Sequence, residues 1–98
     1  MVHWQYYIAA RLLELFNRNQ AAIGFYVATL EIEPGFHRAQ NRMAYVLASL
    51  GRFAQAEPHF QAVLRADPGN AAAHFNLGYV FDKLGRVEQA VAAFREAT

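Results

Sequence analysis

The sequence predicts an all-α fold in which three similar helix–turn–helix hairpins stack side by side. The main observation is a spacing of 34 residues between matching side chains, which appears at several independent positions. The matching sets are Asn17, Gly51 and Gly85; Ala22, Ala56 and Ala90; and Tyr26, Phe60 and Phe94. The Pro-Gly pairs that begin at Pro34 and Pro68 have the same spacing. A period of this length is typical of stacked helical repeats, and it disfavours the alternative of an ordinary bundle with chance self-similarity.

The residue type at each matching position has a physical explanation, which the third repeat illustrates. A small residue such as Gly78 allows two helix backbones to approach closely, and Phe94 fills the space beside it with a large apolar ring. Gly85 suits the left-handed conformation in which many helices end. Pro68 cannot continue a helix, so it separates one repeat from the next.

Apolar residues at spacings of three and four predict two helices in each repeat. The expected helices run over 3–16, 20–33, 37–50, 53–66, 71–84 and 86–97. In the first helix the expected buried stripe is Tyr6, Ala9, Ala10, Leu13 and Phe16. Gly24 lies inside the second helix at a cost of about 1 kcal/mol relative to alanine, and we expect a close helix contact to explain it.

The whole pattern resembles the tetratricopeptide repeat (TPR) family, whose repeat has a large residue, Leu-Gly, an aromatic, an alanine, a second aromatic and a closing proline. The third repeat matches best, through His74, Leu77, Gly78, Phe81, Ala90 and Phe94. The earlier repeats depart from it at Ala9-Ala10, Asn17 and Met43-Ala44, which keep the size class or the backbone tolerance of the pattern.

The resemblance implies a right-handed solenoid that forms a single domain over residues 1–98. Its repeats are expected at about 3–36, 37–70 and 71–98. The third repeat stops before its closing proline, so we expect a truncated last repeat without a capping helix, or a piece of a longer array.

The first helix of each repeat is expected to line a concave face, which would use the stripe not spent on the core. The predicted peptide-binding groove consists of Trp4, Tyr7, Arg11, Arg38, Asn41, Arg42, Tyr45, Phe75, Asn76, Tyr79 and Lys83. Aromatic residues and arginine are enriched at binding hot spots, so this groove is predicted to take an extended or helical peptide with apolar anchors and an acidic group. For any one aromatic, the alternative is burial against a neighbouring helix.

One TPR subclass binds the C-terminal carboxylate of chaperone partners through a clamp of lysine, asparagine and arginine. The corresponding positions here are Tyr7, Arg11, Arg42, Ala72 and Asn76. The clamp pattern is absent, so the sequence does not predict that ligand.

The last helix carries an apolar stripe of Val87, Val91 and Phe94 with no further helix after it. An uncovered apolar end favours self-association, so a homo-oligomer is expected, or continuation into another repeat. The leading hypothesis is therefore a non-catalytic protein-interaction module, and the alternative is a structural or assembly module that pairs through its ends.

Composition argues against other classes of function. The net charge is only +1, from nine basic and eight acidic side chains, so we expect neither nucleic acid nor membrane as a partner. The four histidines have no helical zinc spacing, there is no cysteine, and Ser49 is the only serine, so no metal, cofactor or catalytic residue is predicted. The longest apolar stretch, 21–30, is too short to span a bilayer and no signal peptide is recognisable, which favours the cytoplasm.

Overall fold

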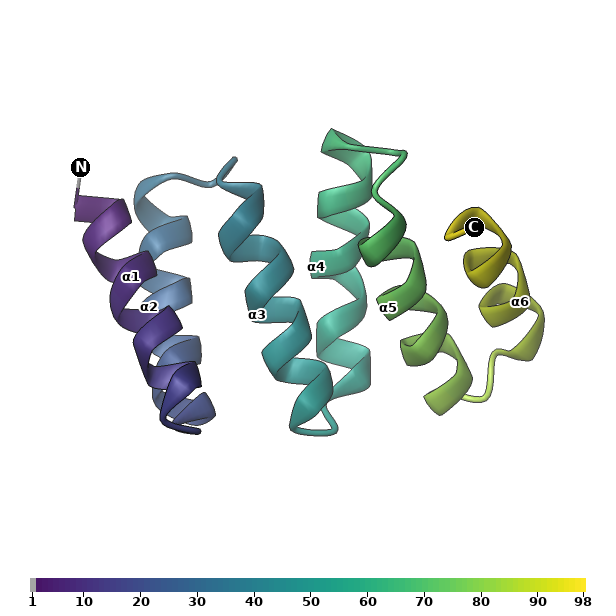
Figure 1. The fold of residues 1–98 in the computed structure, drawn as a ribbon, viewed down its shortest axis with the longest axis horizontal. Helices are drawn as coiled ribbons and strands as arrows, with labels where there is room; N and C mark the ends of the chain where they lie inside the picture. Colours follow the sequence, from purple (N-terminus) through teal and green to yellow (C-terminus); the bar gives the residue numbers. More distant parts are fainter. Residues whose placement is uncertain (1) are drawn as a thin grey trace.

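The computed structural model describes residues 2–98, which form six α-helices and no β-strand (Figure 1). The helices are α1 (Val2–Leu15), α2 (Asn19–Ile32), α3 (His37–Ser49), α4 (Phe53–Ala66), α5 (Ala71–Lys83) and α6 (Val87–Glu96). Every helix begins and ends within one residue of the range expected from the sequence. None of these described helices has the length and apolar character needed to cross a membrane.

The helices pair as three hairpins, α1 with α2, α3 with α4 and α5 with α6, which follow one another along the long axis of the molecule (Figure 1). The second helix of a hairpin also packs against the first helix of the next, α2 on α3 and α4 on α5. The described part of the chain measures 40 × 25 × 19 Å. This arrangement confirms the predicted all-helical solenoid.

The turn inside each hairpin has the geometry that its sequence predicts. Asn17, Gly51 and Gly85 have φ angles of 60°, 80° and 79°. The next amide reaches back to the first helix, as when the Arg86 N–H donates to the Phe81 carbonyl at 2.8 Å. This Schellman arrangement ends a helix with a residue in the left-handed region, and glycine or asparagine adopts it at low cost.

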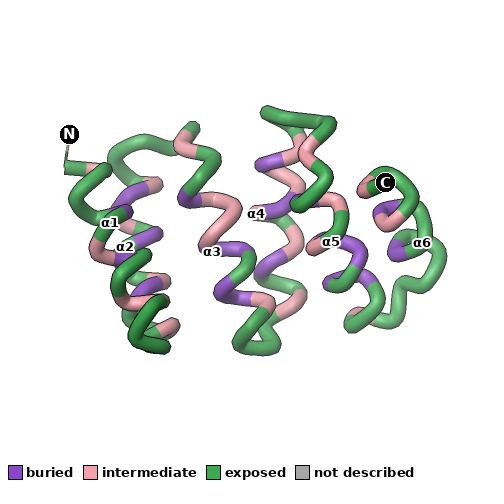
Figure 2. Tube along the Cα trace, viewed as in Figure 1, coloured by how far each residue is buried: buried purple, intermediate pink, exposed green. Residues whose placement is uncertain are grey.

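Each hairpin is held by a small residue on its first helix and an aromatic ring on its second. Ala10 and Ala44 are fully buried, as are Tyr26 and Phe60. In the third hairpin the contact is tighter, and a β-carbon placed on Gly78 would lie 2.7 Å from the ring of Phe94. The buried segments accordingly lie on the sides of the helices that face one another (Figure 2).

Two expectations about the first hairpin are wrong. Tyr6 and Phe16 are exposed, so the buried stripe of α1 is narrower than predicted. The reason is that no helix among the described residues precedes α1, whereas α3 and α5 each have one packed against them. The expected close contact at Gly24 does not exist either, because a β-carbon there would meet no atom within 4 Å.

Gly24 and Gly78 give a matched pair of substitutions with opposite expected signs. Gly24→Ala should raise the free energy of unfolding by about 1 kcal/mol, because alanine is the better helix former and the site is open. Gly78→Ala should lower it by about 1–2 kcal/mol, because the new methyl group displaces the Phe94 ring. Chemical denaturation of both variants checks this, and equal stabilisation by the two would contradict the packing described above.

His59 should make the fold sensitive to mild acid. Its ring is half-buried, its Nδ1 lies 2.7 Å from Gln40 Oε1, and burial lowers the pKa of His59 below its ordinary value of 6.5. The unfolded chain therefore binds a proton more readily than the folded one, and stability should decline as the pH falls below about 6.5. Thermal melts from neutral pH downward should show a smaller decline in His59→Phe, which places there the residue found at the matching Phe25. An unchanged pH profile in that variant would contradict this account.

Candidate functional site

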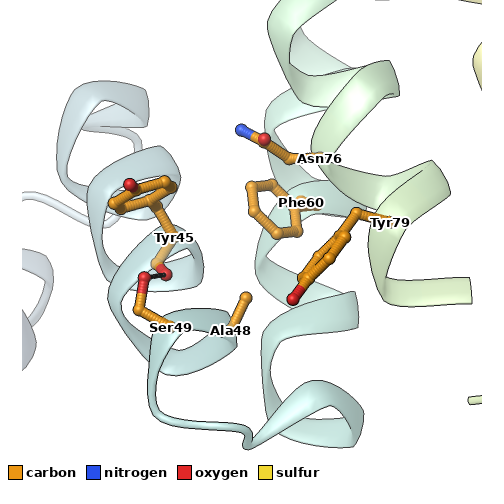
Figure 3. Close-up of a pocket in the computed structure, with 6 residues that line it drawn as sticks. All are labelled: Tyr45, Ala48, Ser49, Phe60, Asn76 and Tyr79. Carbon is orange, nitrogen blue, oxygen red and sulfur yellow. Dashed lines mark hydrogen bonds between the residues drawn. The ribbon is translucent and has the colours of Figure 1, made fainter. Parts of the chain in front are cut away.

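A pocket of about 230 Å³ opens between α3 and α5 (Figure 3). It is lined by Tyr45, Ala48, Ser49, Phe60, Asn76 and Tyr79. The rings of Tyr45 and Tyr79 come from different helices and stand on either side of the Phe60 ring (Figure 3). Because Phe60 is fully buried, it forms an apolar floor beneath two partly exposed aromatic walls.

A second hollow, of about 470 Å³, lies between α1 and α3 and shares Tyr45 and Ser49 with the first. Its other lining residues are Arg11, Glu14, Leu15, Asn17, Asn19 and Arg42. The two hollows therefore adjoin on the face formed by the first helices of the three hairpins. We call the two together the groove.

One exposed aromatic ring on the first helix of each hairpin is paired with a cation. The pairs, with the distance from the cationic centre to the ring centroid, are Arg38 on Trp4 (6.0 Å), Arg42 on Tyr45 (4.7 Å) and Lys83 on Tyr79 (5.4 Å). At exposed sites such contacts contribute about 0.5–1 kcal/mol each. They hold one side of each ring in place before any ligand arrives.

Glu14 is the centre of a polar network at the α1 end of the groove. The Tyr26 hydroxyl and the Arg42 guanidinium both donate hydrogen bonds to its carboxylate, and Arg11 Nε lies 3.7 Å from Glu14 Oε2. Burial, together with the hydrogen bond to Glu14, raises the pKa of Tyr26 well above its ordinary value. The network ties α1, α2 and α3 together, and it neutralises part of the positive charge that the sequence assigned to the groove.

The prediction that Tyr7 lies in the groove needs correction, because only 9% of its surface is exposed. Its ring packs against Tyr26 and Phe36, with ring centroids 6.0 and 5.1 Å away. Phe36 lies in the loop between α2 and α3 and also contacts Trp4 at 4.9 Å. Tyr7 is therefore one of the aromatic residues for which the alternative, burial against neighbouring elements, is correct. Nothing in the sequence indicated the role of Phe36, because a residue in a loop does not contribute to helical periodicity.

The remaining predicted groove residues separate into three places. Arg11, Arg42, Tyr45, Asn76 and Tyr79 line the groove. Lys83 lies beside the groove through its contact with Tyr79, whereas Trp4 and Arg38 contact each other and line neither hollow. Phe75 is exposed and packs on Phe94 at the α6 end, with ring centroids 5.6 Å apart.

Asn41 differs from the other predicted groove residues because it is partly buried. Its side-chain oxygen is shielded from solvent and has no hydrogen-bond partner among residues 2–98. Burying a hydrogen-bond acceptor without a partner costs free energy, so the hydrogen bonding of the Asn41 side chain is incomplete on this face.

The predicted self-association surface is only partly exposed. Val87 and Val91 are exposed on α6, whereas Phe94 is half-buried because its ring covers Gly78. Within the described residues no group of three histidine, cysteine, aspartate or glutamate side chains is placed to hold a metal ion.

Comparisons with known proteins agree with this architecture. A family model described as a tetratricopeptide repeat matches residues 41–98. No curated protein matches the chain. Among solved structures, MamA 41-end from Desulfovibrio magneticus RS-1 superposes with a TM-score of 0.94 at 25% identity, covering 97% of this chain and 54% of that one. Another crystal structure of MamA gives a TM-score of 0.92 at 22% identity, covering 97% of this chain and 56% of that one. The chain thus spans little more than half the length of the solved chains that it matches.

Glu14→Ala should destabilise the fold by about 1–3 kcal/mol, because it leaves the Tyr26 hydroxyl and Arg42 partly buried without their shared partner. Asp82 is the matched control, since it occupies the same repeat position two repeats later and is exposed. Asp82→Ala should change stability by less than about 0.5 kcal/mol. Urea denaturation measures both, and a Glu14→Ala loss no larger than that of Asp82→Ala would contradict the network's structural role.

Proposed function

Since the chain belongs to the tetratricopeptide repeat family, we propose that it is a non-catalytic protein-interaction module that holds a segment of a partner polypeptide in its groove. The fold of this family suggests an interaction or scaffold module. The observation that carries the finer proposal is the pocket in which Tyr45 and Tyr79 face each other across Phe60. Partly exposed tyrosines over a buried apolar floor are the kind of surface that anchors a partner side chain.

The size of the pocket favours one apolar side chain rather than a small-molecule ligand. At about 230 Å³ it is smaller than the roughly 300–1,000 Å³ typical of small-molecule sites. The Asn76 amide at its rim offers both a donor and an acceptor, which suits the backbone of an extended peptide.

The charges beside the pocket favour an acidic group next to that side chain. Arg11 and Arg42 both lie in the adjoining hollow, and Glu14 compensates only one of the two positive charges. Arg42 is committed to Glu14 through hydrogen bonds, whereas Arg11 makes only the longer 3.7 Å contact and is the more exposed of the two. Arg11 is therefore the side chain with charge left for a ligand carboxylate.

A second candidate function is a scaffold that assembles through its ends. The exposed Val87 and Val91 on α6 support it, because adjacent exposed apolar side chains mark a contact surface more often than scattered ones do. The two functions use different faces of the chain, so they can be tested separately.

Groove binding is tested with peptides selected from a random displayed library on the immobilised chain and then measured by calorimetry in solution. Tyr45→Ala and Tyr79→Ala should each weaken binding at least about tenfold, because each removes one wall of the anchor pocket. The selected peptides should share an apolar residue near an acidic one.

Tyr6→Ala is the matched control, because Tyr6 is also an exposed tyrosine on a first helix but does not line the groove. The Tyr6→Ala variant should bind the selected peptides with the same affinity as the wild type. Wild-type affinity in both groove variants, or an equal loss in Tyr6→Ala, would refute the proposal. Thermal melts of all three confirm that each variant is folded.

A further inference from the structure

The end face of α1 matches surfaces that are buried inside the molecule. Leu12 is 50% exposed, whereas Val46 and Val80, at the same repeat position in α3 and α5, are 1% and 0% exposed. Phe16 is 76% exposed, against 40% for its counterpart Leu50 after α3, and its counterpart Leu84 after α5 packs against the core.

The difference has one structural cause. A preceding helix covers α3 and α5, namely α2 and α4, and no described helix covers α1. Leu12 of α1 and Phe16 just after it are nevertheless large apolar side chains. The end face of α1 is therefore built like one half of the interface between repeats.

The outward face of α6 matches the other half of that interface. Thr29 and Val63, near the ends of α2 and α4, are fully buried, but Ala97 at the same repeat position is only partly covered. Phe53 at the start of α4 packs edge-on against Tyr79 of the next hairpin, with ring centroids 5.9 Å apart. Its counterpart Val87 is 63% exposed. In Figure 2, most of the outward turns of α1 and α6 are accordingly exposed.

A polar contact across the repeat junction points to the same partner. Arg52, in the turn of the second hairpin, donates to Gln20 in the first turn of α2 at 2.9 Å. Arg86, one repeat later, forms an ion pair at 2.8 Å with a different position of α4, Glu57, since Ala54 stands where Gln20 does in α2. The corresponding arginine of the first hairpin is Arg18, and the residue of α6 that corresponds to Gln20 is Glu88.

We propose that this chain associates head to tail with a second copy of itself, the α1 end face of one copy covering the α6 face of the other. Leu12 and Phe16 of one copy then pack on Val87, Val91 and Ala97 of the other, and Arg18 pairs with Glu88 where Arg52 pairs with Gln20 inside the molecule. The proposal rests on the second candidate function, assembly through the ends, and names the partner and the two faces that meet. It is independent of peptide binding in the groove, because it uses the two ends of the stack (Figure 1).

Such an interface is heterologous, since its two surfaces differ and a pair of copies keeps one unused surface of each kind, α1 on one copy and α6 on the other. Association of this type does not stop at a dimer unless the chain closes into a ring. A symmetric dimer formed through α6 alone would stop at two copies and would not involve α1. The two arrangements are therefore distinguishable by blocking one end at a time.

The experiment is sedimentation velocity over a concentration series, with one variant blocked at each end. Phe16→Asp blocks the head and Val91→Arg blocks the tail, because Val91 has the repeat position of Glu57, the partner of Arg86, and therefore faces Arg18 of the next copy. Both residues are exposed, so neither change should disturb folding. The wild type should show an average mass that rises with concentration beyond that of a dimer. Each variant alone should remain monomeric, and an equal mixture of the two should form one-to-one dimers only. Val27→Arg is the matched control, because Val27 on α2 is 41% exposed against 44% for Val91, and it should behave as the wild type.

Charge reversal gives a second, independent readout. Arg18→Glu and Glu88→Arg should each abolish association alone, through like-charge contact, and a mixture of the two should recover it because every junction again joins opposite charges. A wild type that stays monomeric at all concentrations, a Phe16→Asp variant that still dimerises, or a mixture that fails to associate would each overturn the proposal.

Discussion

The structure depends on the close approach of two helices at a small residue covered by a ring. In each hairpin the small residue is Ala10, Ala44 or Gly78, and the ring belongs to the second helix. This contact fixes the distance and the angle within the hairpin, so three copies of it stack in the same way. Because the core uses only one stripe of each first helix, the neighbouring stripe remains available to form the groove.

The groove itself is shaped by contacts that have nothing to do with a ligand. Phe60 serves the second hairpin as its buried ring, and it also forms the floor between Tyr45 and Tyr79. Glu14 ties Arg42 and Tyr26 together, which joins α3 to the first hairpin and removes one cation from the groove. Stability and the proposed recognition therefore share side chains. A partner bound in the groove would meet rings that cations already hold in place, which lowers the entropic cost of binding.

The repetition of the sequence made most of the fold predictable, and the failures occur where the repetition breaks. The helices and the left-handed turns at Gly51 and Gly85 followed from spacing and local conformation. Tyr7 was misplaced because its burial depends on Phe36, a loop residue outside any helical pattern. The Glu14 network joins side chains 12 and 28 residues apart, which no short-range spacing reveals. Gly24 was expected to make a close helix contact because glycine lowers helix stability, but a β-carbon placed on it would meet no atom within 4 Å.

We propose that the face between α3 and α5 receives a partner polypeptide. The most direct measurement is an NMR titration of the isotopically labelled chain with a selected peptide, following every assigned backbone amide. We expect the largest shifts to cluster around Tyr45, Ser49, Asn76 and Tyr79, with smaller ones near Arg11. Shifts that concentrate on the outward sides of α2 and α4, or on the end faces of α1 and α6, would contradict it.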